Sequence, residues 1–315
     1  MQPSALSPQH PDSGAVRLGY ACLCLSLDVR YTRGTILKYA QPERLRALIR
    51  GNLQALAPVL EFNRQIGVRV FRLSSDLIPF GGHPVNQIRW WEELGPAFDE
   101  LGRIIREAGL RVSVHPGQYT VLSAVRSEVV EAAMADLVYH ARLLDALGTD
   151  ASHKIVIHGG GVYGDKAAAM ARWVESFRRL PEAVQRRLIV ENDERLFGVE
   201  DVLEISHRSG APVVFDAFHH RVMSGRADDY RRWLEAAFGT WQAGDGPPKI
   251  HFSSQAPGLR PGAHARLVDS DEFADFLAQA PPRPFDCMLE AKDKDKALLL
   301  LREQLAERQL VRPVA

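Results

Sequence analysis

Eight short apolar segments alternate with amphipathic segments along this chain of 315 residues. The apolar segments are rich in β-branched residues, as strands covered on both faces should be, and each leads into a segment with helical spacing of its apolar residues. Strict alternation of strand and helix implies a parallel sheet, and eight such units favour closure into a TIM (β/α)8 barrel. The predicted strands are Arg17–Leu25, Gly67–Leu73, Leu110–His115, Lys154–His158, Leu188–Glu191, Pro212–Asp216, Lys249–Phe252 and Phe285–Glu290.

The clearest predicted helices are Pro42–Ile66, Ser127–Leu147 and Asp293–Arg308, in which apolar residues recur every three or four positions. No linker or fixed-period repeat interrupts the pattern. We therefore predict a single α/β domain, a TIM (β/α)8 barrel over residues 17–310. A mobile tail without a signal peptide's apolar run is expected over residues 1–16. An open doubly wound sheet is the alternative topology.

Six of the predicted strands have, as their last residue or the one before it, a side chain able to bind a metal ion. A parallel barrel gathers the carboxyl ends of its strands on one face, so these side chains should converge there with two loop histidines. The expected ligands are His115, His158, Glu191, Asp216, His251 and Glu290 at the strand ends, and His219 and His264 in the loops. The sequence therefore predicts a metal site at the C-terminal face of the barrel.

The chemistry of these ligands limits which metals fit. Carboxylates crowded at the end of an apolar strand repel one another unless cations hold them. Imidazole and carboxylate without cysteine suit Zn²⁺, Mn²⁺ or Fe²⁺ rather than a structural thiolate zinc site. Eight ligands exceed the needs of one ion, so two or three are implied. Bridged ions about 3.5–4 Å apart are typical of phosphodiester cleavage by a metal-activated hydroxide.

Lys249 lies two residues before His251, so both side chains should point into the barrel. A charged ammonium group beside divalent cations is unfavourable. One interpretation places Lys249 low in the barrel, paired with a carboxylate. The other is a lysine that is neutral, or carboxylated by CO₂, and that acts as a ligand or supports one.

Composition sets broad limits on function. The 39 basic and 39 acidic residues balance, so the bulk charge gives no support for nucleic-acid binding. Three cysteines, all within predicted strands, argue for a reducing compartment rather than a disulfide framework. No apolar stretch approaches the roughly 18 residues that span a bilayer. We expect a soluble, cytoplasmic monomer with no membrane contact.

Several further signals are weaker when taken alone. The segment HGGGVYGDK (158–166) is a glycine-rich turn that can bring backbone amides to a phosphate, but it lacks the P-loop pattern. Gln118 and Tyr119 follow His115 in a loop at the predicted catalytic face, where they either cap the barrel or enter a base stack. We expect no function for the remaining histidines of the tail, the helices and the strand starts, His10, His140, His153 and His207.

Taken together, the motifs resemble the ultraviolet damage endonuclease family, a relative of the endonuclease IV barrels. The resemblance runs from about Arg17 to Arg302 and rests on separated motifs in order. These motifs are RLGYAC, FRLSSDLIPF, VHPGQYTVL, KIVIHGGGVYGDK, VENDE, VFDAFHH, KIHFSSQ and LEAKDKDKAL. It implies a metal-dependent DNA repair endonuclease that nicks immediately 5′ to cyclobutane pyrimidine dimers, 6-4 photoproducts and abasic sites, leaving a 3′-hydroxyl and a 5′-phosphate.

The resemblance also implies roles for individual residues. It makes His115, His158 and Glu191 the ligands of one ion, Glu191, Asp216, His251 and Glu290 those of a second, and His219 and His264 those of a third, next to Lys249. The implied catalytic residues are Glu191, His158, Glu290 and Lys249. Contacts to damaged double-stranded DNA would come from Gln118, Tyr119, Tyr20 and His83. Three divalent ions are implied, Mn²⁺ ahead of Zn²⁺ or Mg²⁺.

One departure from the family pattern is visible. Cys24 stands where the family commonly has asparagine, which puts a polar contact near the lesion in question. Candidate phosphate contacts, chosen on charge alone, are Arg30, Arg33, Lys38, Arg260, Lys292 and Lys294. The alternatives are an abasic-site endonuclease of the endonuclease IV type, a metal-dependent sugar isomerase or epimerase, and a damage-binding protein without catalysis.

Overall fold

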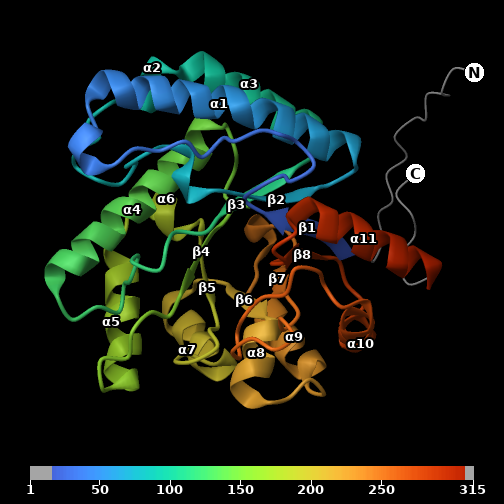
Figure 1. Cartoon of the computed structure of the whole chain (residues 1–315). Helices are drawn as coiled ribbons and strands as arrows, with labels where there is room; N and C mark the ends of the chain where they lie inside the picture. Colours follow the sequence, from blue (N-terminus) through green and yellow to red (C-terminus); the bar gives the residue numbers. More distant parts are fainter. Residues whose placement is uncertain (1–15, 309–315) are drawn as a thin grey trace, which may run out of the picture.

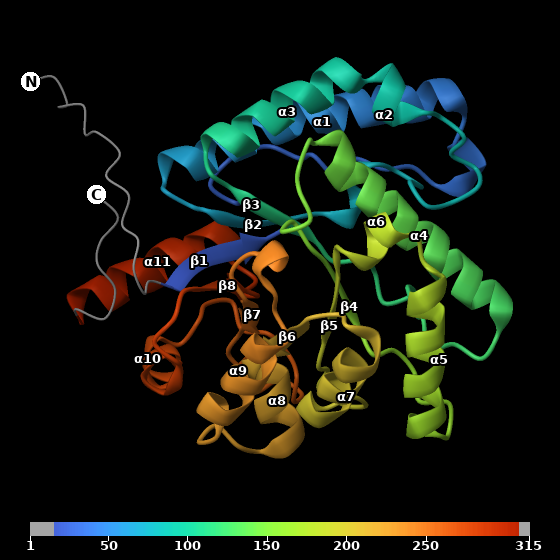
Figure 2. The same cartoon turned by 180° about the vertical axis from the view of Figure 1, so that it is seen from behind.

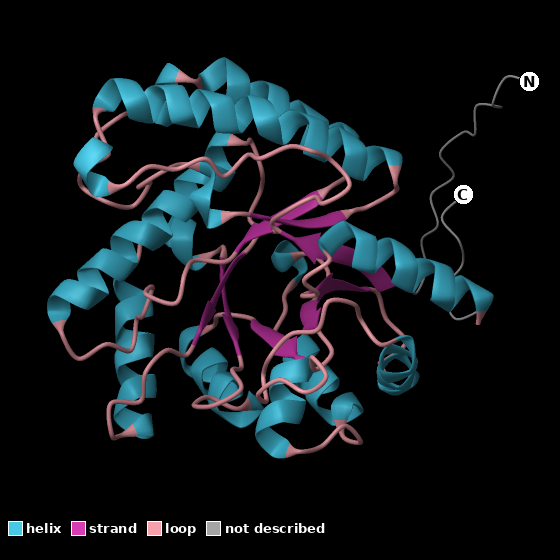
Figure 3. Cartoon of the chain, in the orientation of Figure 1, coloured by secondary structure: helices cyan, strands magenta, loops and turns pink. Residues whose placement is uncertain are grey.

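A computed structural model describes residues 16–308, so the predicted tail over residues 1–16 lies almost wholly outside the described residues. The described chain folds around a closed barrel of eight parallel strands, ordered around the barrel as in the sequence (Figures 1 and 3). The strands are β1 Val16–Ala21, β2 Val70–Leu73, β3 Arg111–Val114, β4 Ile155–His158, β5 Leu188–Glu191, β6 Val213–Asp216, β7 Lys249–Phe252 and β8 Phe285–Leu289. The predicted TIM barrel in a single domain is confirmed.

Helices surround the barrel on its outer side, as the two opposite views show (Figures 1 and 2). Those longer than one turn are α1 Pro42–Gln65, α3 Gly95–Glu107, α4 Ser127–Ala146, α5 Lys166–Arg179, α7 Val199–Ser209, α8 Ala217–Ser224, α9 Tyr230–Gly239, α10 Ser270–Gln279 and α11 Lys294–Glu307. The short helices are α2 Trp90–Glu93 and α6 Glu182–Gln185, with 3₁₀ turns at Leu37–Tyr39, Ser75–Leu77 and Ala243–Asp245. The three helices expected from the sequence lie within one residue of their predicted limits.

β1 ends four residues earlier than predicted, at Ala21. The next residue, Cys22, has φ 68°, a left-handed conformation that a strand cannot continue through. Its amide donates to the carbonyl of Arg72 at 2.8 Å, and its own carbonyl accepts from the Tyr31 hydroxyl. The prediction that Cys22 and Cys24 lie within a strand is therefore wrong, whereas Cys287 does lie in β8.

Alternation along the strands divides the side chains between two environments. Outward-facing residues such as Phe71, Val112 and Ile250 are fully buried and belong to the core cluster that also includes the inner faces of the helices. Inward-facing Val156, Ile189 and Val214 form a separate apolar layer with Trp241, a residue between α9 and β7. Ala21, Val70 and Met288, from β1, β2 and β8, form a second inward-facing apolar cluster, so apolar side chains from both sides of the barrel pack its interior.

Below that layer, the amino end of the barrel holds buried charges that pair with one another. Arg111 donates to Asp286 at 2.7 Å and to three backbone carbonyls, and Asp286 also accepts from Arg17 at 2.7 Å. Lys154 pairs with Asp245, and its ammonium and the guanidinium of Arg111 both lie over the ring of Trp241. The amino end is thereby closed by ion pairs and one tryptophan.

Candidate metal centre

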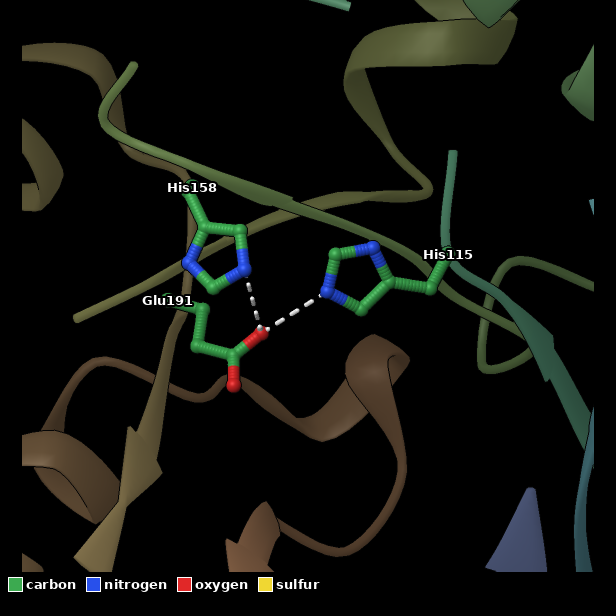
Figure 4. A group of neighbouring side chains, drawn as sticks. All are labelled: His115, His158 and Glu191. Atoms are coloured by element: carbon green, nitrogen blue, oxygen red, sulfur yellow. Dashed lines mark hydrogen bonds and ion pairs between the residues drawn. The ribbon is translucent and has the colours of Figure 1, made fainter. Parts of the chain in front are cut away.

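The side chains at the carboxyl ends of the strands gather around Glu191, the last residue of β5. His115 follows β3, and its Nε2 lies 3.0 Å from Oε2 of Glu191. His158 ends β4, and its Nε2 lies 3.8 Å from the same oxygen. The two imidazoles come from neighbouring strands and point toward that single oxygen, as Figure 4 shows. These three residues form one group that can hold a metal ion.

The other carboxylate oxygen of Glu191 faces the opposite side of the barrel mouth. Nδ1 of His251, from β7, lies 2.7 Å from Oε1 of Glu191 and 3.3 Å from Oε1 of Glu290. Glu290 follows β8 directly, and its Oε1 also accepts from the guanidinium of Arg72 at 2.6 Å. Glu191, His251 and Glu290 form a second group with the geometry of a metal site.

A third group joins Glu191 to Asp216 and His219. Asp216 ends β6 and caps α8, because its carboxylate accepts from the amide of His219 at 2.7 Å. Its other oxygen lies 3.5 Å from Nδ1 of His219, which in turn lies 3.8 Å from Oε1 of Glu191. All three side chains are buried, and Glu191 is therefore common to all three groups found among the described residues.

The eighth expected ligand lies at the edge of this cluster. Nδ1 of His264 is 2.8 Å from the backbone oxygen of Glu290 and 3.8 Å from Oε2 of the same residue. Its ring centroid is 6.1 Å from that of His219. The predicted pair of His219 and His264 is thus adjacent, but His219 groups more closely with Asp216 and Glu191 than with His264.

The electrostatics of the cluster follow from burial and crowding. Burial alone raises the pKa of Glu191, but the imidazoles of His251, His158 and His115 outweigh it and hold that pKa well below its ordinary range. Burial lowers the pKa of His219, but the carboxylates of Asp216, Glu191 and Glu290 raise it to about 9. For Asp216, burial and the neighbouring carboxylates raise the pKa.

Several buried atoms of the cluster have no hydrogen-bond partner in the described residues. They are Oδ2 of Asp216, Nδ1 of His158 and Nε2 of His251. Buried polar atoms are normally paired, so several unpaired nitrogen and oxygen atoms in one buried cluster are typical of a site that binds a further partner. Imidazole nitrogens and carboxylate oxygens within 4.8 Å of one another fit divalent ions. The buried His, Glu and Asp side chains can therefore bind metal.

Lys249 lies one inward-facing position below His251 on β7, in register with Asp286. Its side chain is fully buried, and its Nζ has no hydrogen-bond partner among the described residues. Burial and the nearby guanidinium of Arg111 lower its pKa well below the ordinary lysine value, against the opposing effect of Asp286. The lysine is thus directly beneath the ligand cluster, and within residues 16–308 it does not form a hydrogen-bonded pair with a carboxylate.

The residues expected to contact DNA divide into exposed and buried ones. Tyr119 is 82% exposed, Gln118 is exposed beside it, and His83 is exposed in the loop after β2. Tyr20 is fully buried, its hydroxyl donates to Asn63 of α1 at 2.7 Å, and its ring packs on Phe71. The expected contact between Tyr20 and DNA is therefore not met in this structure, because Tyr20 is a fully buried, outward-facing residue of β1.

Cys24, the departure from the family pattern, is also buried, and burial raises the pKa of its thiol. Of the six candidate phosphate contacts, only Lys294 is half-buried. A cavity of about 580 Å³ is lined by Arg260, Lys292 and His264, so two of those cations lie beside a candidate ligand. A second cavity, of about 370 Å³, opens beside His115 and His158.

Residues not identified from the sequence hold the ligands in place. Arg72, on β2, binds Glu290, and its inward position follows from strand alternation once β2 is located. The side-chain amide of Asn192 donates to the backbone carbonyl of Asp216 at 3.0 Å and accepts from the backbone amide of Asp216 at 2.8 Å. The backbone carbonyl of Asn192 lies 3.0 Å from Nδ1 of His219. Oε2 of Glu194 lies 4.0 Å from Nε2 of His219. Asn192 and Glu194 follow the strand-end residue Glu191 closely in the sequence. This proximity is the one sequence feature that points to a role for them in the site.

A closed parallel barrel with a histidine and carboxylate cluster at its carboxyl face defines a class, the metal-binding TIM-barrel enzymes. Comparisons with known proteins identify the family within this class. The family described as UV-endonuclease UvdE matches residues 16–315. The UV DNA damage endonuclease of Clostridium perfringens (strain 13 / Type A) is 33% identical over 93% of this chain and 71% of that protein. The chain belongs to the UvdE family and is a DNA-cleaving enzyme.

Solved structures agree with this assignment. The crystal structure of SacUVDE superposes with a TM-score of 0.88 at 35% identity, and the match covers 94% of this chain and 100% of that one. Endonuclease IV from Thermus thermophilus gives a TM-score of 0.56 at 17% identity, over 92% of this chain and 99% of that one, which shows a shared fold. Within residues 16–308, no helix is long and apolar enough to cross a membrane.

Proposed function

We propose that this enzyme nicks double-stranded DNA immediately 5′ to cyclobutane pyrimidine dimers, 6-4 photoproducts and abasic sites, leaving a 3′-hydroxyl and a 5′-phosphate. The observation that carries the proposal is the sharing of Glu191 by three ligand groups at the barrel mouth of a UvdE-family chain. Phosphodiester cleavage uses clustered divalent ions of this kind. The enzyme acts as a cytoplasmic monomer.

The cluster would hold three ions, Mn²⁺ ahead of Zn²⁺ or Mg²⁺, on His115, His158, Glu191, Asp216, His219, His251, His264 and Glu290. When bound, the ions supply Lewis acidity, which lowers the pKa of water and neutralises phosphate charge. The protein's own part is to fix the ligands. Arg72 orients Glu290 at 2.6 Å, and Asn192 holds both Asp216 and His219 through three hydrogen bonds.

Lys249 serves the same centre in our proposal. Its Nζ is buried without a partner under the ligands, which disfavours the ammonium form. The neutral amine can add to the carbon of CO₂: an N–C bond forms, one C=O π bond breaks to leave its electron pair on oxygen, and the nitrogen releases one proton, which would convert the lysine into a carboxylate ligand. Lys249→Ala should then reduce both nicking and bound metal. Full activity of Lys249→Ala would contradict the proposal.

Recognition of damage would fall to the exposed loop after β3. Gln118 and Tyr119 would insert where the lesion bases leave the stack, with His83 near the bound strand. A crosslinked dipyrimidine stacks and pairs poorly, so it flips out at lower cost than intact bases. Arg260 and Lys292 beside the larger cavity would contact phosphates.

Tyr119→Ala tests this assignment. Because Tyr119 is 82% exposed, its removal should not disturb the fold or the metal ligands. Binding to a duplex with one dimer should weaken roughly tenfold, the order of one lost base–aromatic stacking contact. Binding titrations alongside metal analysis check this. Loss of metal instead of DNA affinity would contradict the assigned role.

The overall function is tested by incubating supercoiled plasmid with the protein and Mn²⁺. Nicking of irradiated plasmid, with 3′-hydroxyl and 5′-phosphate ends, is the expected result. Nicking of depurinated plasmid alone would favour an abasic-site endonuclease. Absence of nicking on every plasmid would contradict the proposal, since a family endonuclease with an intact ligand cluster should cut one of them.

A further inference from the structure

The turn that carries Gln118 and Tyr119 is fastened to helix α4 by a side-chain hydrogen bond. The amide of Thr120 donates to the carbonyl of Gly117 at 3.0 Å, which makes Gln118 and Tyr119 the two central residues of a β-turn. The hydroxyl of Thr120 donates to Oδ2 of Asp136 at 2.6 Å. Asp136 lies in the middle of α4, so the last residue of an exposed turn is bound to a rigid element.

Asp136 is itself held from two sides. Nδ1 of His140, one helical turn later, lies 2.8 Å from the Asp136 carbonyl oxygen and 3.5 Å from Oδ1 of its carboxylate. Gly82, in the loop that carries His83, packs so closely that a Cβ there would lie 2.7 Å from the Asp136 Cα. The carboxylate that receives Thr120 therefore occupies a fixed position between α4 and a second loop of the catalytic face.

The segments on both sides of the turn are also tied down. Tyr139 of α4 donates to the carbonyl of Ser75 at 3.0 Å, and the Ser75 hydroxyl donates to the carbonyl of His115 at 2.7 Å. Farther along, the hydroxyl of Ser123 donates to the carbonyl of Gly161 at 3.0 Å, and the Ser123 carbonyl accepts from Arg172 at 2.8 Å. Between these anchors, the Thr120–Asp136 bond is the side-chain contact that holds the turn itself.

We propose that Thr120 and Asp136 are positioning residues for damage recognition, holding Gln118 and Tyr119 ready to enter the duplex. This rests on the proposed function, in which that pair inserts beside the lesion. Ordering a loop at the moment of binding costs conformational entropy, and a turn already fixed avoids that cost. Neither residue belongs to the three ligand groups at the barrel mouth, so the bond should affect recognition of paired DNA rather than the chemical step.

The test uses the whole protein with Mn²⁺ and two substrates that share one dimer-containing strand. In the first, the strand is fully paired, and in the second, the bases opposite the dimer and its neighbours are mismatched into a bubble. Thr120→Val removes the hydroxyl but keeps the side-chain shape. It should lower kcat/KM on the paired duplex roughly tenfold, mostly through KM, and leave the bubble nearly unchanged. Thr120→Ser, which keeps the hydroxyl, should restore cutting of the duplex.

Two further variants separate positioning from folding. Thr149→Val is the matched control, because the hydroxyl of Thr149 donates to the Leu144 carbonyl at 2.8 Å after α4, away from the ligand cluster. It should cut both substrates like the parent protein. Asp136→Ala removes the acceptor of the bond at a helical position and should reproduce the selective loss if Thr120→Val folds poorly. Melting temperature and metal content are measured for every variant.

Equal losses on duplex and bubble, or unchanged cutting of the duplex by Thr120→Val and Asp136→Ala, would overturn the positioning role. The parent protein distinguishes this from failure of the proposed function. If the parent cuts both substrates and the variants do too, only the positioning role has failed. If the parent cuts neither, the proposed function has failed and the positioning role falls with it.

Discussion

The two ends of the barrel interior both contain buried charges, but they are organised in opposite ways. At the amino end, Arg111 and Lys154 each face a carboxylate and donate to backbone carbonyls. At the carboxyl end, Asp216 and His251 keep buried atoms without a hydrogen-bond partner among the described residues. A buried pair that is fully bonded serves structure, whereas a buried cluster with unpaired ligand atoms is built for something that binds.

The sharpest test of this contrast is Glu191→Gln at the carboxyl end. The amide keeps the size of the side chain but removes the charge that all three ligand groups share. We expect nicking to fall by at least about 10³-fold, since metal ions supply several kcal/mol to such reactions. The metal-free protein should melt somewhat below the parent, because the imidazoles around Glu191 lower its pKa and so stabilise its carboxylate in the folded state. Plasmid nicking measures the loss of activity, and thermal denaturation in a chelator shows how much of the variant is folded; a folded Glu191→Gln that nicks like the parent would contradict the contrast.

At the amino end, Asp286→Ala should have the reverse effect. It leaves the buried guanidinium of Arg111 without its carboxylate and takes a partner from Arg17. Removing one member of a buried pair costs about 3–5 kcal/mol of unfolding free energy. Denaturant unfolding measures the loss, and nicking per folded molecule should stay near that of the parent. An inactive but fully stable variant would show that this end also serves catalysis.

A pH titration of stability examines the amino end through His153, whose Nδ1 accepts from the amide of Val112 at 3.1 Å. Burial lowers the pKa of His153 from 6.5 to about 4. The unfolded chain therefore binds a proton more readily, and stability is fully present above pH 6.5 and falls as the pH drops toward 4. The neutral form of His153 contributes at most about 3 kcal/mol to the pH dependence of the unfolding free energy.

The matched variant is His153→Gln, which cannot titrate in this range. The unfolding free energy of the parent should fall more steeply between pH 6.5 and 4 than that of the variant. Because the ligand histidines are present in both proteins, the difference isolates the amino end. Parallel curves would mean that His153 is not held neutral by burial.

Addition of Mn²⁺ should stabilise the parent protein through the carboxyl end. An ion at a hundredfold excess over its dissociation constant contributes about 2.7 kcal/mol if it binds the folded state alone. The melting temperature of the parent should rise on addition of Mn²⁺, and that of Glu191→Gln should rise less. Asp286→Ala starts from a lower melting temperature and should show the same rise as the parent. An equal rise in the parent and Glu191→Gln would place the bound ions elsewhere.

Much of the fold was predictable because the strand signal is strong. Seven of the eight strands end within one residue of the prediction, since buried parallel strands are apolar runs that stop at a polar residue. Those same polar residues became the ligand candidates, and strand polarity alone brought them to one face. The convergence of His115, His158 and Glu191 needed no knowledge of side-chain packing.

The parts that were not predicted depend on tertiary contacts. The end of β1 is set by the left-handed Cys22, and its sequence continues apolar beyond that point. The sequence predicts that Tyr20 contacts DNA. Side chains alternate along β1, however, and this alternation turns Tyr20 outward, where its hydroxyl donates to Asn63 of α1. Arg72 and Asn192 support the ligands through bonds to residues distant in the sequence or to backbone atoms. Spacing along one chain does not encode such bonds.

The closure of the amino end by Trp241 also has a kinetic consequence. Val156, Ile189, Val214 and Trp241 fill the barrel below the ligand cluster, so the described molecule is a cup rather than a tube. In the proposed function, ions and DNA would therefore share one entrance, the rim around His115 and His264. In the proposed function, a duplex lying across that rim would cover the exit of the ions, and metal exchange would wait until the nicked product leaves.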